Sequence, residues 1–386
     1  MNQNLVDLQN LKKEFDGTPV LRGISLSIKR REFVTLLGPS GCGKTTTLRI
    51  IGGFEQPDSG DVFFDGKRLN DVPPYQREIN TVFQRYALFP HLNVAENIAF
   101  GLHIKKLDRA DIKRKTAEML ELVGLRGFEN RDVTSLSGGQ QQRVAIARTL
   151  APEPAVLFMD EPLSNLDAKL RLEMRYELQR LHVETGSTFV YVTHDQMEAM
   201  TLATKICLIN NGVLQQYEAP LTVYSRPNNL FVADFVGNPS INFIEARGVQ
   251  NENGSLDVTI LDGRKAKFVP KEHLDLQRWF AERDKNEADE AARHKEQMQD
   301  KKAVEKSNKD EVFKYHIARV NEDDYALQEA PVITNEDFVI GVRPEALQLH
   351  DGAGLDGVIY GAMPTGMEST INLRIGDFLL TGVVFG

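Results

Sequence analysis

The sequence predicts an α/β domain with a mostly parallel sheet, followed by a small all-β domain. Two observations support this division of the 386 residues. Over about the first 236 residues, β-rich runs alternate with helix-like segments, which is typical of parallel sheets covered by helices. After that point, short β-prone pieces follow one another, which indicates a small barrel or sandwich. We therefore expect one domain over residues 1–236 and a second over residues 237–386.

The composition excludes several classes of protein. The chain is 41% hydrophobic and 26% charged, as ordinary globular proteins are. Its longest apolar runs, such as Ala155–Met159, are far shorter than the ~20 residues of a membrane-spanning helix, and its N-terminus lacks the pattern of a signal peptide. Cys42 and Cys207 form no CxxC pair, which excludes a disulfide scaffold and a cysteine zinc site. The net charge of −9 argues against a general nucleic-acid binder.

Local patterns predict the elements of the first domain. Short apolar runs are expected as buried strands, and turn residues such as Asp65-Gly66 and Asn211-Gly212 predict two hairpins. Residues from about 85 to 150 have a helical pattern with little strand signal. In chain order, the expected strands are Glu32–Leu37, Asp61–Phe64, Val156–Asp160, Thr188–Thr193, Lys205–Ile209 and Val213–Tyr217, and the expected helices include Lys44–Gly52 and Ala168–Glu184.

The second domain combines β-prone pieces with one highly charged segment. Residues 282–311 are mostly charged, with both signs mixed, and predict either an exposed helix or a disordered insertion. The expected strands are Asn242–Ala246, Leu256–Leu261, Phe338–Val342, Thr370–Ile375 and Phe378–Val384.

A glycine-rich loop joins the first buried strand to the first helix. Residues 38–45, GPSGCGKT, satisfy the pattern G-x-x-x-x-G-K-[ST] of phosphate-binding loops. Its glycines let backbone N–H groups converge on an anion, and the helix N-terminus adds partial positive charge. We expect Lys44 to reach the β- and γ-phosphates and Thr45 to bind Mg²⁺, with the Cys42 thiol incidental. The expected nucleotide-binding residues of the loop are Gly38, Ser40, Gly41, Cys42, Gly43, Lys44, Thr45 and Thr46.

A second buried strand ends in two carboxylates. The apolar run Val156–Met159 is followed by Asp160 and Glu161. Together with the phosphate loop upstream, this pattern predicts that Asp160 holds Mg²⁺ and that Glu161 contacts the attacking water.

The segment Leu136–Arg148, LSGGQQQRVAIAR, resembles the signature sequence of ATP-binding-cassette (ABC) ATPases. Ser137, Gly138, Gly139 and Gln140 form a helix start rich in N–H groups, which is a second anion site on the same chain. The resemblance implies that this site serves the phosphate loop of another subunit, in a head-to-tail homodimer that encloses two ATP molecules.

Single positions extend the resemblance. It implies that Gln84 is the Q-loop glutamine, that His194 is the switch histidine, and that Asp167 belongs to the D-loop Ser164–Asp167. Phe15 aligns with the aromatic residue that stacks on adenine. The implied catalytic residues are Glu161, His194 and Gln84, and the implied Mg²⁺ ligands are Thr45, Gln84 and Asp160.

The second domain also carries a resemblance. Gly341–Glu345, GVRPE, is similar to a segment of the transport-associated OB-fold domain that follows the cassette in importer ATPases of the maltose-transporter type, and Phe231–Pro239 resembles the junction into it. The similarity is dense over residues 4 to about 245 and looser beyond. The charged insertion is longer than the family usually carries, and the resemblance implies further strands beyond Gly386.

The resemblance implies a function in transport. We expect the ATP-hydrolysing motor of a bacterial importer, which uses ATP and Mg²⁺ at the cytoplasmic face of the cell membrane. The implied partners are two transmembrane permease subunits, an extracytoplasmic solute-binding protein and a second copy of this chain. The permeases are expected to contact Tyr86, Leu88, Phe89 and Leu92, which are large apolar residues beside Gln84.

The cargo rests on resemblance alone, because this subunit does not touch it. Gly237–Phe243 is similar to sugar importers, whereas Asn80–Gln84 and Ala87–His91 are more similar to polyamine importers. We expect a carbohydrate, with a polyamine as the alternative. A non-transport ABC ATPase that acts on nucleic acid is a remote alternative, because OB-folds can bind oligonucleotides. Co-purification with permeases or with ribosomes and DNA would distinguish these alternatives.

Overall fold

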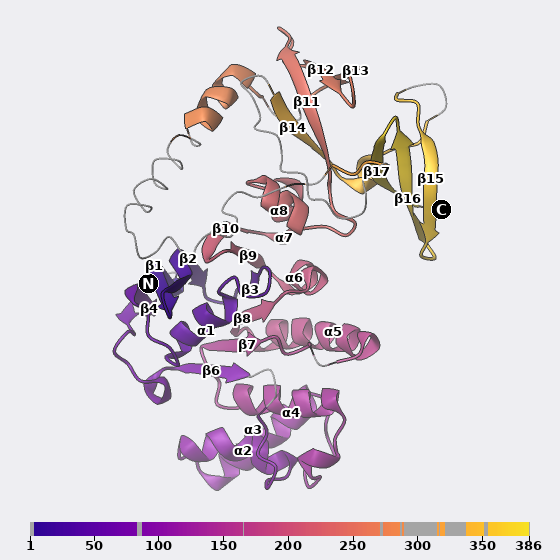
Figure 1. Ribbon diagram of the computed structural model, residues 1–386. Coiled ribbons are helices and arrows are strands. Elements are labelled where there is room, and N and C mark those ends of the chain that lie inside the picture. The colour runs from indigo at the N-terminus through magenta and orange to yellow at the C-terminus, as the bar shows by residue number, and fades with distance from the viewer. Residues whose placement is uncertain are drawn as a thin grey trace. The chain divides into compact units, whose positions relative to one another are not determined.

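Figure 1 shows a computed structural model of the chain, which describes residues 4–82, 87–164, 166–270, 273–285, 288, 315, 317–320, 337–350 and 354–385. The chain divides into two compact units, Met1–Asn228 and Asn229–Gly386. This division precedes the expected boundary after residue 236, because the short helix α8 (Leu230–Phe235) is fastened to the second unit. Arg343 donates hydrogen bonds to the carbonyl oxygens of Ala233 and Val236. Among the described residues, none of the helices has the length and apolar character of a membrane span.

The first unit is built on a six-stranded sheet with the strand order β10-β9-β3-β8-β7-β6. All of its strands are parallel except β10, which pairs antiparallel with β9 in the predicted hairpin. The strands are β3 (Phe33–Leu37), β6 (Ile79–Val82), β7 (Val156–Asp160), β8 (Thr188–Thr193), β9 (Lys205–Asn210) and β10 (Val213–Glu218).

Both faces of this sheet are buried. Successive side chains of a strand point to opposite faces. In β7, Leu157 and Met159 therefore join the core beneath the helices, whereas Val156 and Phe158 join the core on the other face. This explains why the sheet's strands appear in the sequence as continuous apolar runs.

Helices cover the parallel sheet, and three of them form a separate helical subdomain. The helices are α1 (Lys44–Gly52), α2 (Val94–Ile104), α3 (Arg109–Leu122), α4 (Gly138–Leu150), α5 (Ala168–Thr185), α6 (Gln196–Leu202) and α7 (Pro220–Ser225), with 3-10 turns at Pro74–Gln76 and Val133–Ser135. The helical subdomain, α2 to α4, lies where the sequence predicts helices. Helices α2 to α5 each begin after an Asn, Asp or Ser whose side chain accepts a backbone N–H, which satisfies a donor that the helix leaves free.

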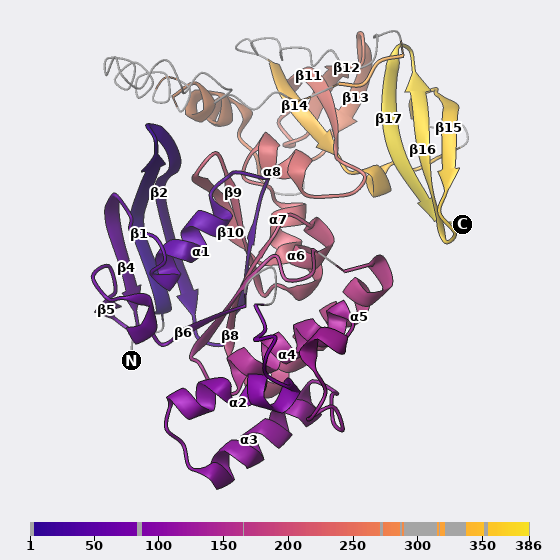
Figure 2. The same ribbon diagram turned by 60° about the horizontal axis from the view of Figure 1, so that its bottom comes forward.

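An antiparallel sheet with the order β2-β1-β4-β5 completes the first unit. Helix α1 lies between the two sheets (Figure 2), and its apolar residues share one core with both of them. The sequence patterns did not predict β1 and β2, whose burial pattern is irregular and whose pairing is interrupted by register shifts, or the short strand β6 of the parallel sheet. The strands are β1 (Asn4–Phe15), β2 (Thr18–Lys29), β4 (Ser59–Phe64) and β5 (Lys67–Arg68).

Arg77 fastens the end of the helix that follows the phosphate loop. Its guanidinium is buried and donates to the carbonyl oxygens of Ile50 at 2.9 Å and Ile51 at 2.6 Å, at the C-terminus of α1. It also donates to the carbonyl oxygens of Leu69 and Val72, both at 2.8 Å. Helix-end carbonyls need partners, and a cation suits this end of the helix dipole. Burial lowers the pKa of Arg77.

The second unit contains two antiparallel sheets, with the orders β13-β12-β11-β14 and β15-β16-β17. Side chains from both sheets, including Ile244 and Leu380, form one core. The Asn242 amide links the sheets, because it donates to the carbonyl oxygens of Val342 and Thr381 and accepts from the Thr381 N–H. This architecture confirms the predicted fold class.

The strands of the second unit include all five pieces that the sequence predicts. Strands β13 and β15 were not predicted; β13 is largely polar, and the side chains of β15 are almost all exposed. Residues 276–285 are helical, and most of the charged segment 282–311 lies outside the described residues. The elements are β11 (Asn242–Gln250), β12 (Leu256–Ile260), β13 (Arg264–Phe268), β14 (Asp337–Val342), β15 (Val358–Pro364), β16 (Glu368–Ile375), β17 (Phe378–Phe385) and a 3-10 turn at Pro344–Ala346.

Candidate active site

The phosphate loop is held tightly against its surroundings at two glycines. Gly38 ends β3 with a φ of 153°, and a Cβ there would lie 2.1 Å from the carbonyl oxygen of Ile209. Gly43 has a φ of 106°, and a Cβ there would lie 2.5 Å from a methyl carbon of Leu21. Only glycine fits both the backbone conformation and the space at these positions.

The Lys44 ammonium lies inside the loop. It is 5% exposed and donates to the carbonyl oxygens of Gly38 and Pro39, both at 2.8 Å. Both acceptors are neutral, and a phosphate oxygen is a stronger partner because charge-assisted hydrogen bonds are about twice as strong. Lys44 is therefore placed to bind an anion that enters the loop.

The Cys42 thiol lies beneath this loop. It is buried beside Gly38, and the carbonyl oxygen of Cys42 accepts a hydrogen bond from the N–H of Gly212. Burial raises the pKa of the thiol, and the nearby Lys44 opposes this rise. Of the other predicted loop residues, Ser40, Gly41 and Thr45 are exposed and Thr46 is half-buried.

Thr45 and Asp160 meet although 115 positions separate them in the sequence. The Thr45 hydroxyl donates to the Asp160 carboxylate at 3.1 Å. Burial raises the pKa of Asp160, and the adjacent Glu161 adds to this, whereas Thr45, Lys44 and Arg49 act in the opposite direction.

This donor pair fits Mg²⁺. A hydroxyl and a carboxylate oxygen are hard ligands, and Mg²⁺ usually takes only one or two carboxylates, with phosphate and water completing its shell. No cluster of three or more His, Cys, Asp or Glu side chains that could hold a metal occurs in the described parts of the chain. Gln84, the third predicted ligand, lies outside the described residues.

Glu161 and His194 form a carboxylate–imidazole pair directly after β7 and β8. His194 Nδ1 lies 3.2 Å from Glu161 Oε1. Glu161 has a φ of 43°, a left-handed conformation that is uncommon for a non-glycine residue and is often found at functional sites. Its N–H donates to the carbonyl oxygen of Val192, and its own carbonyl accepts from the Ser164 hydroxyl, so the strained residue is held on both sides.

The signature segment forms the exposed start of helix α4. Ser137 and Gln140 make a capping box, in which each side chain binds the other's backbone N–H. A Cβ on Gly139 would lie 2.8 Å from the side chain of Leu170, so this segment packs closely against the start of α5. Among the described residues, no hydrogen bond joins Ser137–Gln140 to the phosphate loop. The chain therefore presents two separate helix starts that suit anions.

Two further predicted residues lie elsewhere in the first unit. Asp167 is exposed and caps α5, where its carboxylate accepts from the N–H of Leu170 at 3.0 Å. Phe15 ends β1 with 42% of its surface exposed, and the Lys13 ammonium lies 5.1 Å from the centre of its ring. An exposed ring of this kind is available for stacking.

Sequence reasoning missed a buried polar group behind His194. Glu198, on α6, is 4% exposed and accepts hydrogen bonds from the hydroxyls of Tyr191 and Thr193, both at 2.7 Å. Arg171, on α5, lies beside it. These residues match no motif; their one sequence signal is a polar residue inside an otherwise apolar pattern.

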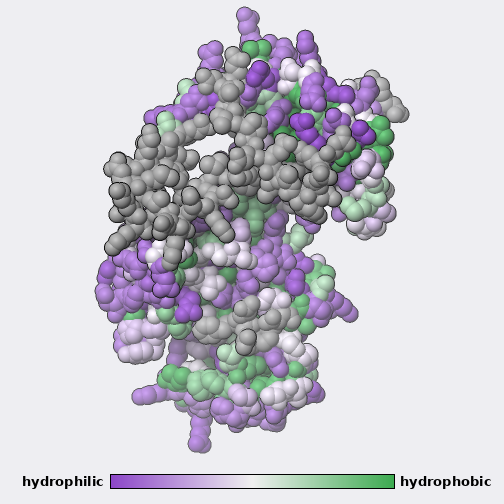
Figure 3. Space-filling model, viewed as in Figure 1, coloured by the Kyte–Doolittle hydropathy of each residue, from purple (hydrophilic) through white to green (hydrophobic). Residues whose placement is uncertain are grey.

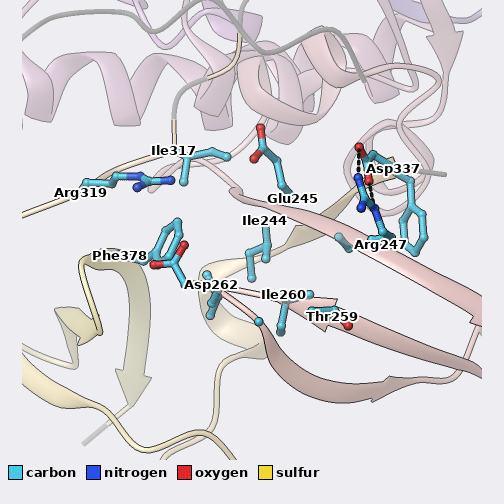
Figure 4. A pocket seen from close by; sticks show the side chains of 14 residues that line it. Ile244, Glu245, Arg247, Thr259, Ile260, Asp262, Ile317, Arg319, Asp337 and Phe378 are labelled. Atoms are coloured by element: carbon cyan, nitrogen blue, oxygen red, sulfur yellow. Dashed lines mark hydrogen bonds and ion pairs between the residues drawn. The ribbon is translucent and has the colours of Figure 1, made fainter. Parts of the chain in front are cut away.

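The second unit has a pocket of about 380 Å³ that involves none of the predicted residues. Figure 4 shows the Arg247–Asp337 ion pair at one side, with two contacts of 2.6 and 3.0 Å. At the other side, the Arg319 guanidinium lies 4.5 Å from the ring centre of Phe378. Charges of both signs surround the pocket, and those of Arg247 and Asp337 already compensate each other.

Comparisons with known proteins agree with the site. A family model described as ABC transporter matches residues 21–164. The structure resembles that of cbiO1 from Clostridium perfringens, part of the ABC transporter complex cbiONQ, with a TM-score of 0.54, 29% identity, and coverage of 58% of this chain and 92% of that one.

Curated relatives are more similar still. The chain is 54% identical to the spermidine/putrescine import ATP-binding protein PotA of Clostridium novyi, over 70% of this chain and 76% of the relative. It is 57% identical to the protein of the same name from Desulfitobacterium hafniense, over 62% and 69% of the two chains. The chain therefore belongs to the ATP-binding proteins of ABC transporters and is an ATPase of the importer group.

Proposed function

We propose that this ATPase powers the import of polyamines such as spermidine and putrescine. The observation that carries the proposal is the identity of 54% and 57% to two importer ATPases that are named for these cargoes. The relatives favour the polyamine alternative over the carbohydrate that we expected from Gly237–Phe243. That segment leads into β11 of the second unit, and its likeness to sugar importers covers only a few residues, whereas the identity to the two relatives extends over 241 residues or more.

The phosphates of ATP bind at the loop between β3 and α1. Lys44 and the loop N–H groups hold the β- and γ-phosphates, and Phe15 stacks on the adenine. Thr45, Asp160 and Gln84 would hold Mg²⁺, which supplies charge neutralisation for the transferred phosphoryl group. The 3.1 Å contact between Thr45 and Asp160 supports this assignment, because it places two of the three ligands together.

Glu161 is the general base, and His194 orients the reacting groups. The Glu161 carboxylate follows the strand that presents Asp160, and its contact with His194 at 3.2 Å places both side chains at one edge of the sheet. Phosphoryl transfer depends mostly on positioning and on charge stabilisation. A water held by Glu161 beside the γ-phosphate satisfies the positioning requirement.

Two copies of the chain build each complete site. The signature segment Ser137–Gln140 begins helix α4 with Ser137 and Gly138 exposed, separate from the phosphate loop of its own chain. In a head-to-tail homodimer, Ser137 and Gly139 of one copy contact the γ-phosphate held by the other. Hydrolysis then requires closure of the dimer, which is also the movement that drives transport.

A groove on the helical subdomain supports the proposed permease contact. It has a volume of about 830 Å³ and is lined chiefly by residues of α2 and α3, where apolar side chains such as Ala95, Ile112 and Leu120 lie among charged ones such as Glu96 and Lys113. Figure 3 shows hydrophobic residues grouped over this subdomain among hydrophilic ones. Grooves between helices of this kind accept the apolar face of another helix. We assign the groove to a cytoplasmic helix of a permease, which would keep the chain at the cytoplasmic face of the membrane; an extracytoplasmic solute-binding protein would deliver the cargo.

The residues that the sequence offered for this contact are only partly available. Leu92 lines the groove and is half-buried. Leu88 packs against the core of the helical subdomain. The Phe89 ring contacts the ring of Phe100 at a centre-to-centre distance of 4.3 Å, and Tyr86 lies outside the described residues. We therefore place the permease contact in the groove beside α2 and α3 and not on the loop of residues 86–92.

Ala95→Glu should prevent assembly with the permeases, because it replaces a small apolar side chain of the groove with a larger, charged one. The second position of a helix tolerates an acidic residue, so folding should be preserved. The matched control is Ala110→Glu, the same change at the second position of α3, where the side chain is exposed outside the groove. Pull-down of the permease pair should fail for Ala95→Glu and succeed for the control. Equal pull-down by both variants would place the contact elsewhere.

Glu161→Gln should lower ATP hydrolysis by about 10²–10⁴-fold, the usual effect of losing a general base. ATP affinity should persist, because Lys44 and the loop N–H groups are unchanged. Turnover and equilibrium nucleotide binding measure the two effects separately, with Glu173→Gln, an exposed acid on α5, as the control. Hydrolysis by Glu161→Gln at the rate of the unsubstituted protein would remove Glu161 from the mechanism.

The cargo assignment is tested by uptake in cells that lack this chain. Uptake of labelled spermidine and putrescine should fall, and the unsubstituted chain should restore it, whereas Lys44→Ala should not. Maltose uptake, measured in the same cells, should be unchanged. Normal polyamine uptake together with reduced sugar uptake would contradict the proposal and restore the carbohydrate interpretation.

A further inference from the structure

We propose that Arg171 is a positioning residue that couples the signature segment of a chain to the His194 of the same chain. The inference rests on the role proposed above for His194. Arg171 lies in the first turn of α5, directly after the D-loop, and its side chain is half-buried. Its guanidinium faces two loops. One is the D-loop, which packs against the signature segment, and the other is the loop that carries His194.

The first contact reaches the D-loop. Arg171 Nη2 donates to the carbonyl oxygen of Leu166 at 3.2 Å. The side chain of Leu166 lies beneath the signature segment, since a Cβ on Gly138 would be 3.6 Å from it. A shift of the signature segment is therefore transmitted to the peptide that Arg171 holds.

The second contact reaches the loop that carries His194. Arg171 Nη1 lies 3.6 Å from the carboxylate of Asp195, the residue that follows the histidine. Asp195 is fixed in turn, because its carboxylate accepts from two N–H groups at the start of α6 and its own N–H donates to the Thr193 hydroxyl at 3.0 Å. The position of Asp195 thus sets the orientation of His194, which lies between Asp195 and the end of β8.

A buried carboxylate holds the guanidinium between the two loops. Glu198 Oε1 lies 3.9 Å from Arg171 Nε, while its other oxygen is occupied by Tyr191 and Thr193. Both ion pairs of Arg171 are longer than a hydrogen bond, and its Nε has no hydrogen-bond acceptor among the residues that the structure describes. A small movement of either loop would convert these ion pairs into hydrogen bonds, so the arrangement responds to the position of the signature segment.

In the proposed dimer, this link joins the two ATP sites. The signature segment of a chain serves the ATP on the other copy, whereas its His194 serves the ATP on its own phosphate loop. When the signature segment of a chain binds the ATP of the other copy, the movement would pass through Leu166, Arg171 and Asp195 and adjust His194 at the chain's own ATP. Lysine cannot replace this function fully, because it lacks the planar fork that contacts several acceptors.

The test is a double-mutant cycle on ATP turnover by the full-length chain. Arg171→Met should lower kcat by about 10- to 100-fold, with KM changed less than about twofold, because misplaced catalytic groups cost turnover while the phosphate loop is untouched. Arg171→Lys should recover part of the loss. If Arg171 acts through His194, the double variant with His194→Ala should be no slower than His194→Ala alone.

Control variants separate the possible failures. Arg180→Met removes an arginine on the same helix that pairs with Glu177 and Glu184, and it should leave turnover unchanged. Normal turnover of Arg171→Met beside a defective His194→Ala would overturn the coupling alone, as would losses that multiply in the double variant. Normal turnover of His194→Ala would overturn the assignment of the histidine and the coupling with it. Should Arg171→Met fail to fold, the same cycle with Arg171→Lys decides between these outcomes.

Discussion

The parallel pairing of β3, β7 and β8 is the constraint on which the site depends. In the sheet, Leu37 is in register with Thr193, and Asp160 with Val192, so the three strands end at one edge. The segments that follow them carry the phosphate loop, the Asp160–Glu161 pair and His194. The register of a sheet buried on both faces is strongly specified, because a slip of one residue would exchange the two cores. Core packing thereby fixes the relative positions of groups that lie far apart in the sequence.

Two residues at this edge combine an unusual backbone conformation with close contacts. Gly38 leaves no room for a side chain beside Ile209, and Glu161 holds a left-handed backbone conformation. Contacts with neighbouring strands stabilise both features, which the loops could not maintain by themselves. Arg77 stabilises the C-terminus of α1, because its guanidinium donates to two carbonyl oxygens of that helix and to two of the segment Leu69–Val72.

The sequence predicts the parts of the molecule that local patterns encode. The phosphate loop, most of the buried strands and the helix of the signature segment follow from glycine spacing, apolar runs and the helical pattern of residues 85–150. The meeting of Thr45 with Asp160 could be expected only because strand ends of a parallel sheet converge.

Other features of the structure have no local signal in the sequence. Arg77 and Arg171 act on backbone carbonyls that any residue supplies, and Glu198 acts through hydroxyls on a neighbouring strand. The groove between α2 and α3 depends on helix packing, so the sequence indicated the nearby apolar loop instead.

The central claim is that a complete ATP site needs two copies of the chain. It is tested most directly by mixing Ser137→Arg, which blocks the signature segment, with Lys44→Ala, which disables the phosphate loop. In a mixed dimer, the intact loop of one copy faces the intact signature segment of the other. The account predicts negligible hydrolysis by either variant alone, intact ATP binding by Ser137→Arg, and partial hydrolysis on mixing. Full hydrolysis by Ser137→Arg alone, or none in the mixture, would contradict it.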